Sequence, residues 1–221
     1  MDHLGNERES NQYDYKNPKQ SRMNNFIKET VNILLSVLVA FILFVFIRTF
    51  LFFPFEVVGQ SMEPTLLSGD RLILNRLGSV DRFDVVVFPA PDDPDSGEDY
   101  VKRIIGLPGD EIKYVEDNLY INGNLINEHY LEPSKEELQK KLEENPEQVN
   151  FTQITNDFSL LDISSGDSAV VPPDTYFVLG DNRQNSKDSR VFGFLNQETV
   201  EGTASLRIWP LDRIGFLEKN E

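Results

Sequence analysis

The chain offers few side chains that can attack a carbonyl group, so its possible chemistry is narrow. It has no cysteine, which excludes a thiol nucleophile, a disulfide framework and a cysteine-ligated metal. Its two histidines are His3, in a polar tail, and His129, in an acidic stretch far from any motif. A Ser-His-Asp triad or a histidine zinc site therefore has little to build on. The remaining strong combination is a serine hydroxyl activated by a lysine amine.

Lys102 has the sequence context that such a lysine base needs. A free lysine titrates near about 10.4, so a lysine that accepts a proton at neutral pH must have a pKa depressed by burial. Lys102 lies in the apolar run YVKRIIG, residues 100–106. Strand alternation places it on the face of Tyr100 and Ile104 and places Arg103 on the opposite face, so we expect only one of the two cations to enter an apolar site. The alternative is an exposed edge-strand lysine that opposes aggregation.

Ser61 is the serine best placed to act as a nucleophile. It stands in VVGQSMEPTL, residues 57–66, between Gly59 and Pro64. Glycine and proline favour an unusual backbone path, which can aim a hydroxyl and nearby amide groups at a carbonyl. An ordinary turn explains the same residues, so the motif alone does not decide the function.

A third polar cluster follows a short apolar run. It reads GDNRQNSKDSR over residues 180–190, directly after residues 176–179. Small polar and ionic side chains at this density can orient neighbouring groups through local hydrogen bonds. A solvated loop is the alternative interpretation.

The amino-terminal part predicts a tail and a membrane anchor. Residues 1–25 are polar and have no hydrophobic period, so we expect a disordered tail. Residues 31–47 carry no charge, and a helix over this apolar stretch is about 25 to 35 Å long, which matches a bilayer core. We therefore predict a transmembrane anchor over residues 26–54. A cleavable secretory signal competes with this interpretation, but Arg48 and phenylalanines follow the apolar run where a signal has small residues.

Basic residues predict the orientation of this anchor. Several of them precede the span, and after Arg48 the next one is Arg71. Basic residues favour the cytoplasmic side of a membrane, so the amino end is expected in the cytoplasm and residues 55–221 outside it. The basic residues nearest to the span on its amino side are Lys16, Lys19, Arg22 and Lys28.

The body, residues 55–221, predicts a mainly β fold with an antiparallel sheet. Short runs rich in Val, Ile, Tyr and Phe alternate with turn residues, and Asn122-Gly123 between two apolar runs is a strong hairpin signal. Residues 129–167 differ in composition, with Glu and Lys three and four positions apart. We expect them to form a small, helical surface insertion without a role in the chemistry.

The charge of the chain excludes one class of partner. Its net charge is −16, and the acidic excess lies after the apolar segment. Nucleic-acid binding depends on clustered positive charge, so we expect no nucleic-acid partner. The Ser-Lys chemistry also needs no metal or nucleotide cofactor.

Taken together, the three segments resemble the bacterial type I signal peptidases, or leader peptidases, which are Ser-Lys dyad serine peptidases. The motif S-M-x-P-T-L is complete at residues 61–66, K-R-x-x-G-x-P-G-D at residues 102–110, and G-D-N-R-x-N-S-x-D-S-R at residues 180–190. These motifs in this order, after an anchor, are highly specific. The resemblance covers roughly residues 35–215, apart from the insertion.

The resemblance implies a role for each motif residue. Ser61 matches the nucleophile and Lys102 the general base. Ser186 matches the serine whose hydroxyl orients that lysine. Asp188 and Arg190 match a structural ion pair that supports the site.

Two residues beside the nucleophile need separate interpretation. Some family members have a hydroxyl residue at the position of Gly59 that contributes to the oxyanion hole, and glycine cannot supply one. The backbone N–H of Ser61 is the expected donor, and the second donor stays open. Met62 is expected near the substrate groove, with ordinary core packing as the alternative.

The function implied by the resemblance is that of a membrane-bound serine endopeptidase. It removes signal peptides from exported preproteins at the bacterial plasma membrane, with an Ala-x-Ala preference, in contact with membrane lipid. One alternative is a non-catalytic, membrane-tethered β domain that binds peptides. Another is a self-cleaving Ser-Lys peptidase of the repressor type, which should carry a DNA-binding helix pair where this chain has an anchor.

Overall fold

The computed structural model describes residues 18–50, 52–163 and 168–217. The chain forms two units, Met1–Ile47 and Arg48–Glu221. The first is helical wherever it is described, and the second carries every strand of the described residues.

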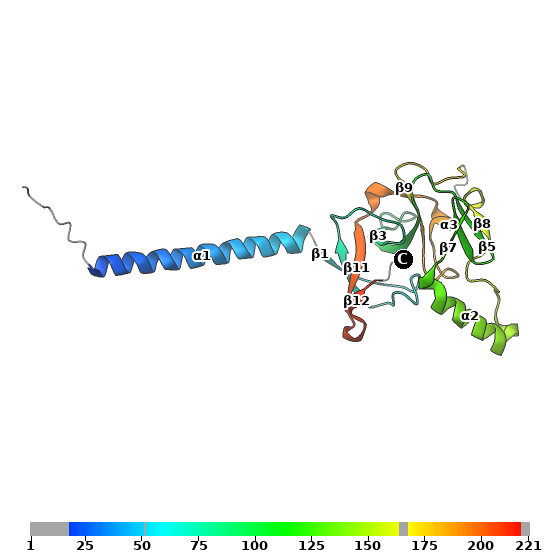
Figure 1. Cartoon of the computed structure of the whole chain (residues 1–221), viewed down its shortest axis with the longest axis horizontal. Helices are drawn as coiled ribbons and strands as arrows, with labels where there is room; N and C mark the ends of the chain where they lie inside the picture. Colours follow the sequence, from blue (N-terminus) through cyan, green and yellow to red (C-terminus); the bar gives the residue numbers. More distant parts are fainter. Residues whose placement is uncertain (1–17, 51, 164–167, 218–221) are drawn as a thin grey trace, which may run out of the picture. The chain divides into compact units, whose positions relative to one another are not determined.

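One helix, α1 (Pro18–Phe50), forms the described part of the first unit (Figure 1). Its apolar stretch Asn25–Val45 is 21 residues long and unburied, which is long enough to cross a membrane. The helix begins before the predicted anchor because residues 19–50 contain no proline and no glycine, and proline is tolerated in a first helical turn. The expectation of disorder is therefore wrong for residues 18–25, and residues 1–17 lie outside the described residues.

The anchor also ends earlier than its predicted end at residue 54. Helix α1 ends at Phe50, and Phe52–Glu56 form strand β1, which pairs antiparallel with β2 (Arg71–Asn75). Aromatic residues suit a paired strand as well as an apolar helix, so the partner strand decides between the two. The β-rich body therefore begins with β1.

The larger sheet of the body has eight strands, and each of its pairs is antiparallel, which confirms the predicted fold class. Their order is β1-β2-β11-β3-β4-β9-β10, with β12 also paired to β11. Besides β1 and β2, the strands are β3 (Val85–Pro89), β4 (Asp99–Gly106), β9 (Thr175–Leu179), β10 (Leu195–Asn196), β11 (Gly202–Trp209) and β12 (Gly215–Phe216).

A smaller sheet has the order β7-β6-β5-β8. The predicted hairpin at Asn122-Gly123 is confirmed, because these two residues connect β6 to β7 and have φ values of 53° and 78°. Positive φ at both positions is what a tight two-residue hairpin turn requires. The strands are β5 (Ile112–Val115), β6 (Asn118–Ile121), β7 (Asn124–Ile126) and β8 (Phe158–Ser159).

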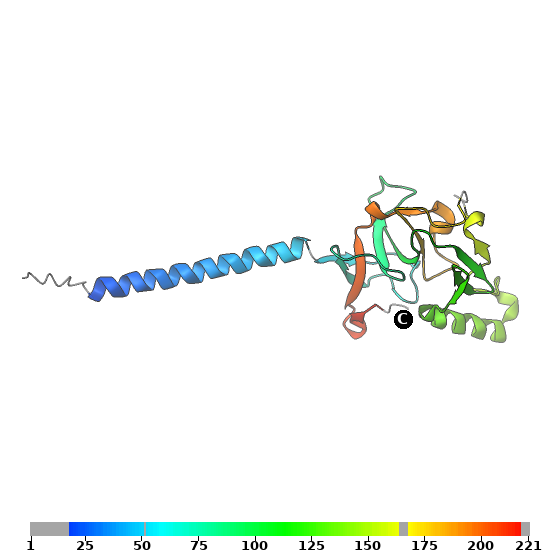
Figure 2. The same ribbon diagram turned by 45° about the horizontal axis from the view of Figure 1, so that its top comes forward.

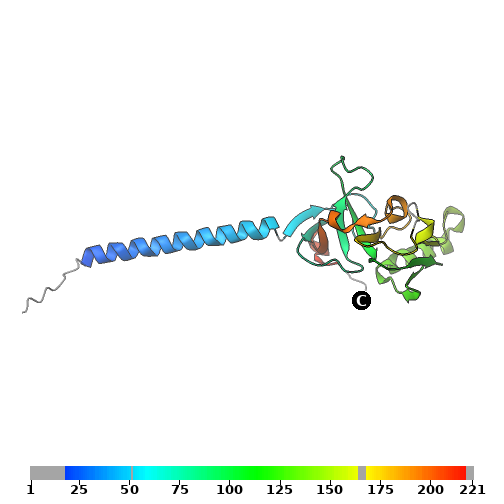
Figure 3. The same cartoon turned by 90° about the horizontal axis from the view of Figure 1, so that it is seen from above.

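The segment predicted as an insertion is helical in part but contributes more than surface. Helix α2 (Glu132–Glu144) is largely exposed and buries Leu138. The same segment supplies β8 to the smaller sheet and the buried residues Tyr130, Ile154 and Leu160 to its core. Helix α2 and the strands of the smaller sheet lie together at one end of the body in all three views (Figures 1, 2 and 3).

The remaining helices are short. They are η1 (His129–Leu131), η2 (Pro146–Gln148), η3 (Leu160–Asp162), α3 (Ser189–Phe192), η4 (Gln197–Thr199) and η5 (Leu211–Arg213).

Three apolar clusters form the core of the body. One joins the smaller sheet to Phe177 and Leu179 of β9. Another lies under the connection between β1 and β2 and contains Met62 and Leu66. The third lies around Phe88 of β3. Packed apolar side chains therefore hold the residues that follow β1, and they hold β9 itself up to Leu179.

Candidate active site

Strand β4 carries two adjacent cations to opposite sides of the sheet. Lys102 is 3% exposed and Arg103 is 0% exposed. The Lys102 Nζ lies 5.0 Å from the centre of the Tyr100 ring, which confirms the predicted shared face. The expectation that only one of these cations enters an apolar site is wrong. Arg103 is buried as well, because a carboxylate compensates its positive charge.

The partner of Arg103 is Asp181, which follows β9. Arg103 Nε donates to Asp181 Oδ1 at 2.9 Å and Nη2 donates to Oδ2 at 2.6 Å, and Nη1 donates to the Phe83 carbonyl oxygen at 2.9 Å. A bidentate pair of this kind compensates for the loss of water around both charges. Our sequence interpretation did not identify this pair, although both residues belong to the quoted motifs.

Ser61 lies in the connection between β1 and β2, where a glycine conformation and hydrogen bonds from Asn182 fix its backbone. Gly59 has a φ of +93°, a conformation that favours glycine. Asn182 N donates to the Ser61 carbonyl oxygen at 3.0 Å, and Asn182 Nδ2 donates to the Gln60 carbonyl oxygen at 3.0 Å. Met62 is 1% exposed and packs in the core below. Residues 57–70, which connect β1 to β2, are called the serine loop below. The loop after β9, residues 180–188, therefore fixes the path of the serine loop.

The structure brings Ser61 and Lys102 into direct contact. The Nζ of Lys102 lies 2.8 Å from the Oγ of Ser61 and 2.9 Å from the carbonyl oxygen of Val101. A neutral amine has one lone pair and two N–H groups. It can accept the Ser61 proton through the lone pair while one N–H donates to Val101.

Burial lowers the pKa of Lys102, so that the amine can lose its proton closer to neutral pH. Burial lowers the pKa of Lys102 from 10.5 to about 8, although the charges of Asp188 and Asp181 act in the opposite direction. Neither carboxylate forms an ion pair with Lys102 within the described residues; they pair with Arg190 and Arg103. Desolvation therefore dominates this pKa.

Ser186 and Gly180 pack closely beside the serine loop. A methyl group added to Gly180 would lie 2.2 Å from Ser186 Oγ and 2.4 Å from the Ser61 carbonyl oxygen, so only glycine fits there. Ser186 Oγ is buried and has no hydrogen-bond partner among the described residues. The second N–H of a neutral Lys102 is the kind of donor that this oxygen lacks.

Asp188 and Arg190 form an ion pair directly after this loop. Arg190 Nη2 lies 2.8 Å from Asp188 Oδ2, and Arg190 Nε donates to Oδ1 at 2.8 Å. Asp188 is fully buried, and its Oδ2 also accepts the Gly180 N–H at 3.1 Å. The pair therefore holds the glycine that packs against Ser61.

Arg183 forms a second buried ion pair, which our sequence interpretation also missed. Its Nη2 lies 2.6 Å from Glu128 Oε1, and its Nε donates to the Gly180 carbonyl oxygen at 3.0 Å. Its Nη1 donates to Tyr114 at 2.9 Å and to Thr155 at 3.1 Å. The segment that contains Thr155 thus helps to hold the loop beside the serine.

An open groove of about 780 Å³ gives access to Ser61 and Lys102. It is bordered by the end of β1, the serine loop and the first half of β4, and Met62 contributes to its lining. Within the described part of the chain, residues 99–102 of β4 pair with β3 only, because pairing with β9 begins at Arg103. One edge of β4 is therefore unpaired along the groove.

The body is mainly antiparallel β, and a serine hydrogen-bonded to a buried lysine faces an open groove. This is the arrangement of a serine peptidase. Residues 30–209 match the family model described as "Signal peptidase, peptidase S26". The chain belongs to this family.

Two named relatives agree with this assignment. The chain is 42% identical over 174 residues to a Signal peptidase I of Bacillus caldolyticus, covering 77% of this chain and 86% of the relative. It is 35% identical over 195 residues to a Signal peptidase IB of Staphylococcus aureus, covering 86% of this chain and 94% of the relative. A crystal structure of a signal peptidase I from Enterococcus faecalis is 41% identical, with a TM-score of 0.48, and covers 58% of this chain and 98% of that one.

Proposed function

We propose that this protein is a membrane-bound serine endopeptidase that removes signal peptides from exported preproteins with Ser61 as nucleophile and Lys102 as general base. The observation that carries the proposal is the 2.8 Å contact between Lys102 Nζ and Ser61 Oγ, at a lysine with a pKa of about 8. Family membership and the relatives named Signal peptidase I support the substrate class.

The substrate binds in the groove as an extended strand. The free edge of β4 over residues 99–102 offers backbone groups that an extended peptide can pair with, in the manner of strand addition. This edge leads to Lys102, so a peptide bound there passes Ser61. Backbone pairing supplies affinity for varied sequences, whereas side-chain pockets supply selectivity.

Catalysis then proceeds through an acyl-enzyme. Neutral Lys102 takes the Ser61 proton as the hydroxyl oxygen attacks the scissile carbonyl carbon. The lysine returns this proton to the leaving amine when the peptide bond breaks. Water, deprotonated by the same amine, attacks the ester. The lysine gives this proton to the Ser61 oxygen as the ester bond breaks and the signal peptide leaves. Acylation and deacylation thus each return the lysine to its neutral state.

The oxyanion that forms in these steps needs fixed N–H donors. The Ser61 N–H donates no hydrogen bond within the described residues, so it remains free to bind the oxyanion. Gly59 lies close by in sequence and can contribute only through its backbone.

Three residues after β9 position the dyad. Ser186 accepts the second N–H of neutral Lys102 and so orients its lone pair toward Ser61. Asp188 and Arg190 hold the loop in place through their ion pair and the Gly180 contact. These residues act through the lysine and the loop rather than on the substrate.

The membrane assignment depends on α1. Its stretch Asn25–Val45 spans the bacterial plasma membrane once and contacts lipid, with the amino end in the cytoplasm and the body outside, where exported preproteins emerge. More basic residues precede the span than lie in the residues directly after it, which supports this orientation. The acidic body supports the absence of nucleic acid among the partners.

The test is cleavage of a model preprotein by the full-length chain in detergent. We expect wild type to release the mature protein, and Ser61→Ala and Lys102→Ala to lose this activity while they stay folded and bound to detergent micelles. The same experiment excludes a β domain that only binds peptides. Substantial cleavage by either purified variant would reject the dyad.

A further inference from the structure

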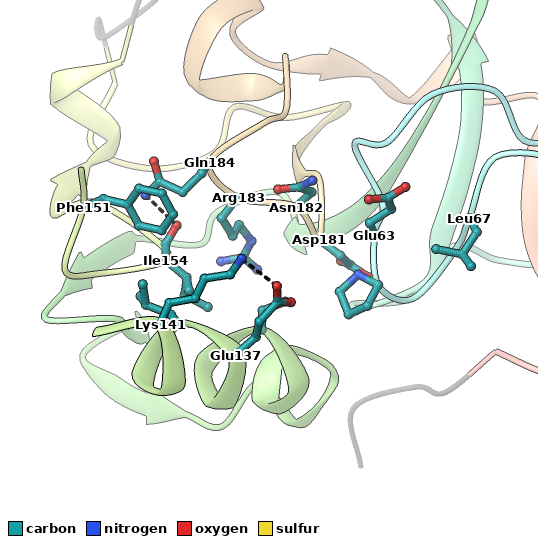
Figure 4. Close-up of a pocket in the computed structure, with 13 residues that line it drawn as sticks. Glu63, Leu67, Glu137, Lys141, Phe151, Ile154, Asp181, Asn182, Arg183 and Gln184 are labelled. Carbon is teal, nitrogen blue, oxygen red and sulfur yellow. Dashed lines mark hydrogen bonds and ion pairs between the residues drawn. The ribbon is translucent and has the colours of Figure 1, made fainter. Parts of the chain in front are cut away.

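A second cavity lies beside the serine loop, and Lys102 is not among its lining residues. It has a volume of about 320 Å³ and is formed by α2, the residues before β8, the serine loop and the loop after β9 (Figure 4). In Figure 4, Glu137 and Lys141 point from α2 toward Arg183, with Phe151 on one side and Glu63 on the other.

The loop after β9 separates this cavity from the groove. Its residues 181–184 line the cavity, whereas Asn185 and Lys187 line the groove. Asn182 in this wall donates two hydrogen bonds to the backbone of the serine loop, at Ser61 and Gln60. Glu63 and Pro64, two and three positions after Ser61, line the cavity directly. The cavity therefore begins beside the nucleophile.

The lining combines an apolar floor with one unpaired charge. Leu138 and Ile154 are 7% and 5% exposed, and Phe151 is 37% exposed. Lys141 Nζ lies 2.6 Å from Glu137 Oε1, so these two charges cancel.

The two buried charges of the lining also have partners. Asp181 pairs with Arg103, and Arg183 pairs with Glu128. Among the described lining residues, Glu63 is the one charged side chain without an ion-pair partner. The cavity accordingly suits apolar side chains and disfavours a carboxylate near Glu63.

We propose that this cavity binds the part of the preprotein on the carboxyl side of the scissile bond, the segment that becomes the new amino terminus. This inference rests on the proposed function. A chain whose amino-side residues occupy the groove along β4 must leave Ser61 past the opposite flank, where Glu63 and Asn182 lie. An extended chain advances about 3.3 Å per residue, so the residues that follow the first one run along the cavity that Phe151 helps to line. The segment expected to be a surface insertion thereby contributes to substrate selection.

The experiment compares two peptide substrates with full-length enzyme in detergent. Both share the residues before the scissile bond; the short one ends one residue after it, and the long one continues for about six residues with a leucine among them. We expect wild type to cleave the long peptide about tenfold more efficiently in kcat/KM, because apolar surface is buried in the cavity.

Substitution of the lining should remove this preference. In Phe151→Ala the ratio of long to short should fall toward one, and cleavage of the short peptide reports that the variant is folded. The matched control is Leu161→Ala, a 58% exposed apolar residue outside the lining, which should keep the wild-type ratio. Wild type should cleave a long peptide with lysine after the scissile bond better than one with aspartate, because of the Glu63 carboxylate. Glu63→Lys should reverse this order.

The possible failures are distinct. Equal cleavage of both peptides by wild type, or an unchanged ratio in Phe151→Ala, overturns the cavity's role and leaves the peptidase function standing. If wild type cleaves neither peptide nor the model preprotein, the proposed function itself fails.

Discussion

The two faces of β4 bury neighbouring cations in different surroundings. Arg103 meets the Asp181 carboxylate at 2.6 Å, and although burial opposes its charge, Asp181 raises its pKa above the ordinary value. Lys102 meets a neutral hydroxyl at 2.8 Å, and burial lowers its pKa to about 8. Burial is nearly complete at both sites. Contact with a carboxylate, rather than burial itself, separates a structural cation from a base.

Exchanging the two cation types is the strongest way to break this comparison. Arginine stays protonated at any physiological pH, so Lys102→Arg should lower kcat/KM at least about 1,000-fold. Arg103→Lys should keep measurable cleavage, because a lysine there still faces Asp181. Preprotein cleavage by the two purified variants measures both effects. More than a tenth of wild-type activity in Lys102→Arg would contradict the assignment of the base.

Removing the Asp181 carboxylate should show how much free energy is needed to bury the Arg103 charge without a partner. Asp181→Asn leaves Arg103 buried without a counter-charge, and the free energy of unfolding should fall by about 3 to 5 kcal/mol. Chemical denaturation of the full-length chain in detergent measures the loss. Asp212→Asn, at an exposed position, is the control and should change stability by less than about 0.5 kcal/mol. A comparable loss in both variants would mean that the buried pair has no special importance.

The pH dependence of cleavage should report the other face of β4. The reaction needs neutral Lys102, and protons occupy the amine below its pKa of about 8, so kcat/KM should fall about tenfold for each unit below that pH. Above the pKa the rate should level off. A pH–rate profile with one model substrate tests this, and an activity that stays constant down to about pH 6 would be incompatible with a lysine base.

The smallest expected effect is a gain in stability. Lys102→Met removes a charge that burial disfavours, so the variant should be inactive and more stable at pH 7 by about 1 to 2 kcal/mol. The folded-state pKa of about 8 lies below the unfolded value of 10.5. Native Lys102 is therefore destabilising below about pH 8, and this penalty fades as pH rises toward 10.5. Unfolding at pH 7 and pH 10 should show the gain shrinking, and a loss at pH 7 would count against it.

Much of the site could be predicted because the chemistry depends on residue types in short motifs. The absence of cysteine and the scarcity of histidine left a serine and a lysine, and the apolar context of Lys102 indicated a depressed pKa. The Asn122-Gly123 hairpin was predictable for a similar reason, since the backbone conformation of a tight turn is decided by the two residues within it.

The sequence by itself thus predicted which serine and lysine to propose as the reacting pair, and it predicted the antiparallel β fold of the body. The tertiary structure decided how charges are compensated: Lys102 meets Ser61 across 41 positions, Arg103 meets Asp181 across 78, and Arg183 meets Glu128 across 55. It also made the segment around α2 part of a core and of a cavity beside the serine loop. The physical reason is that burial and pairing depend on which distant segments pack together, and a local pattern carries no record of its partner.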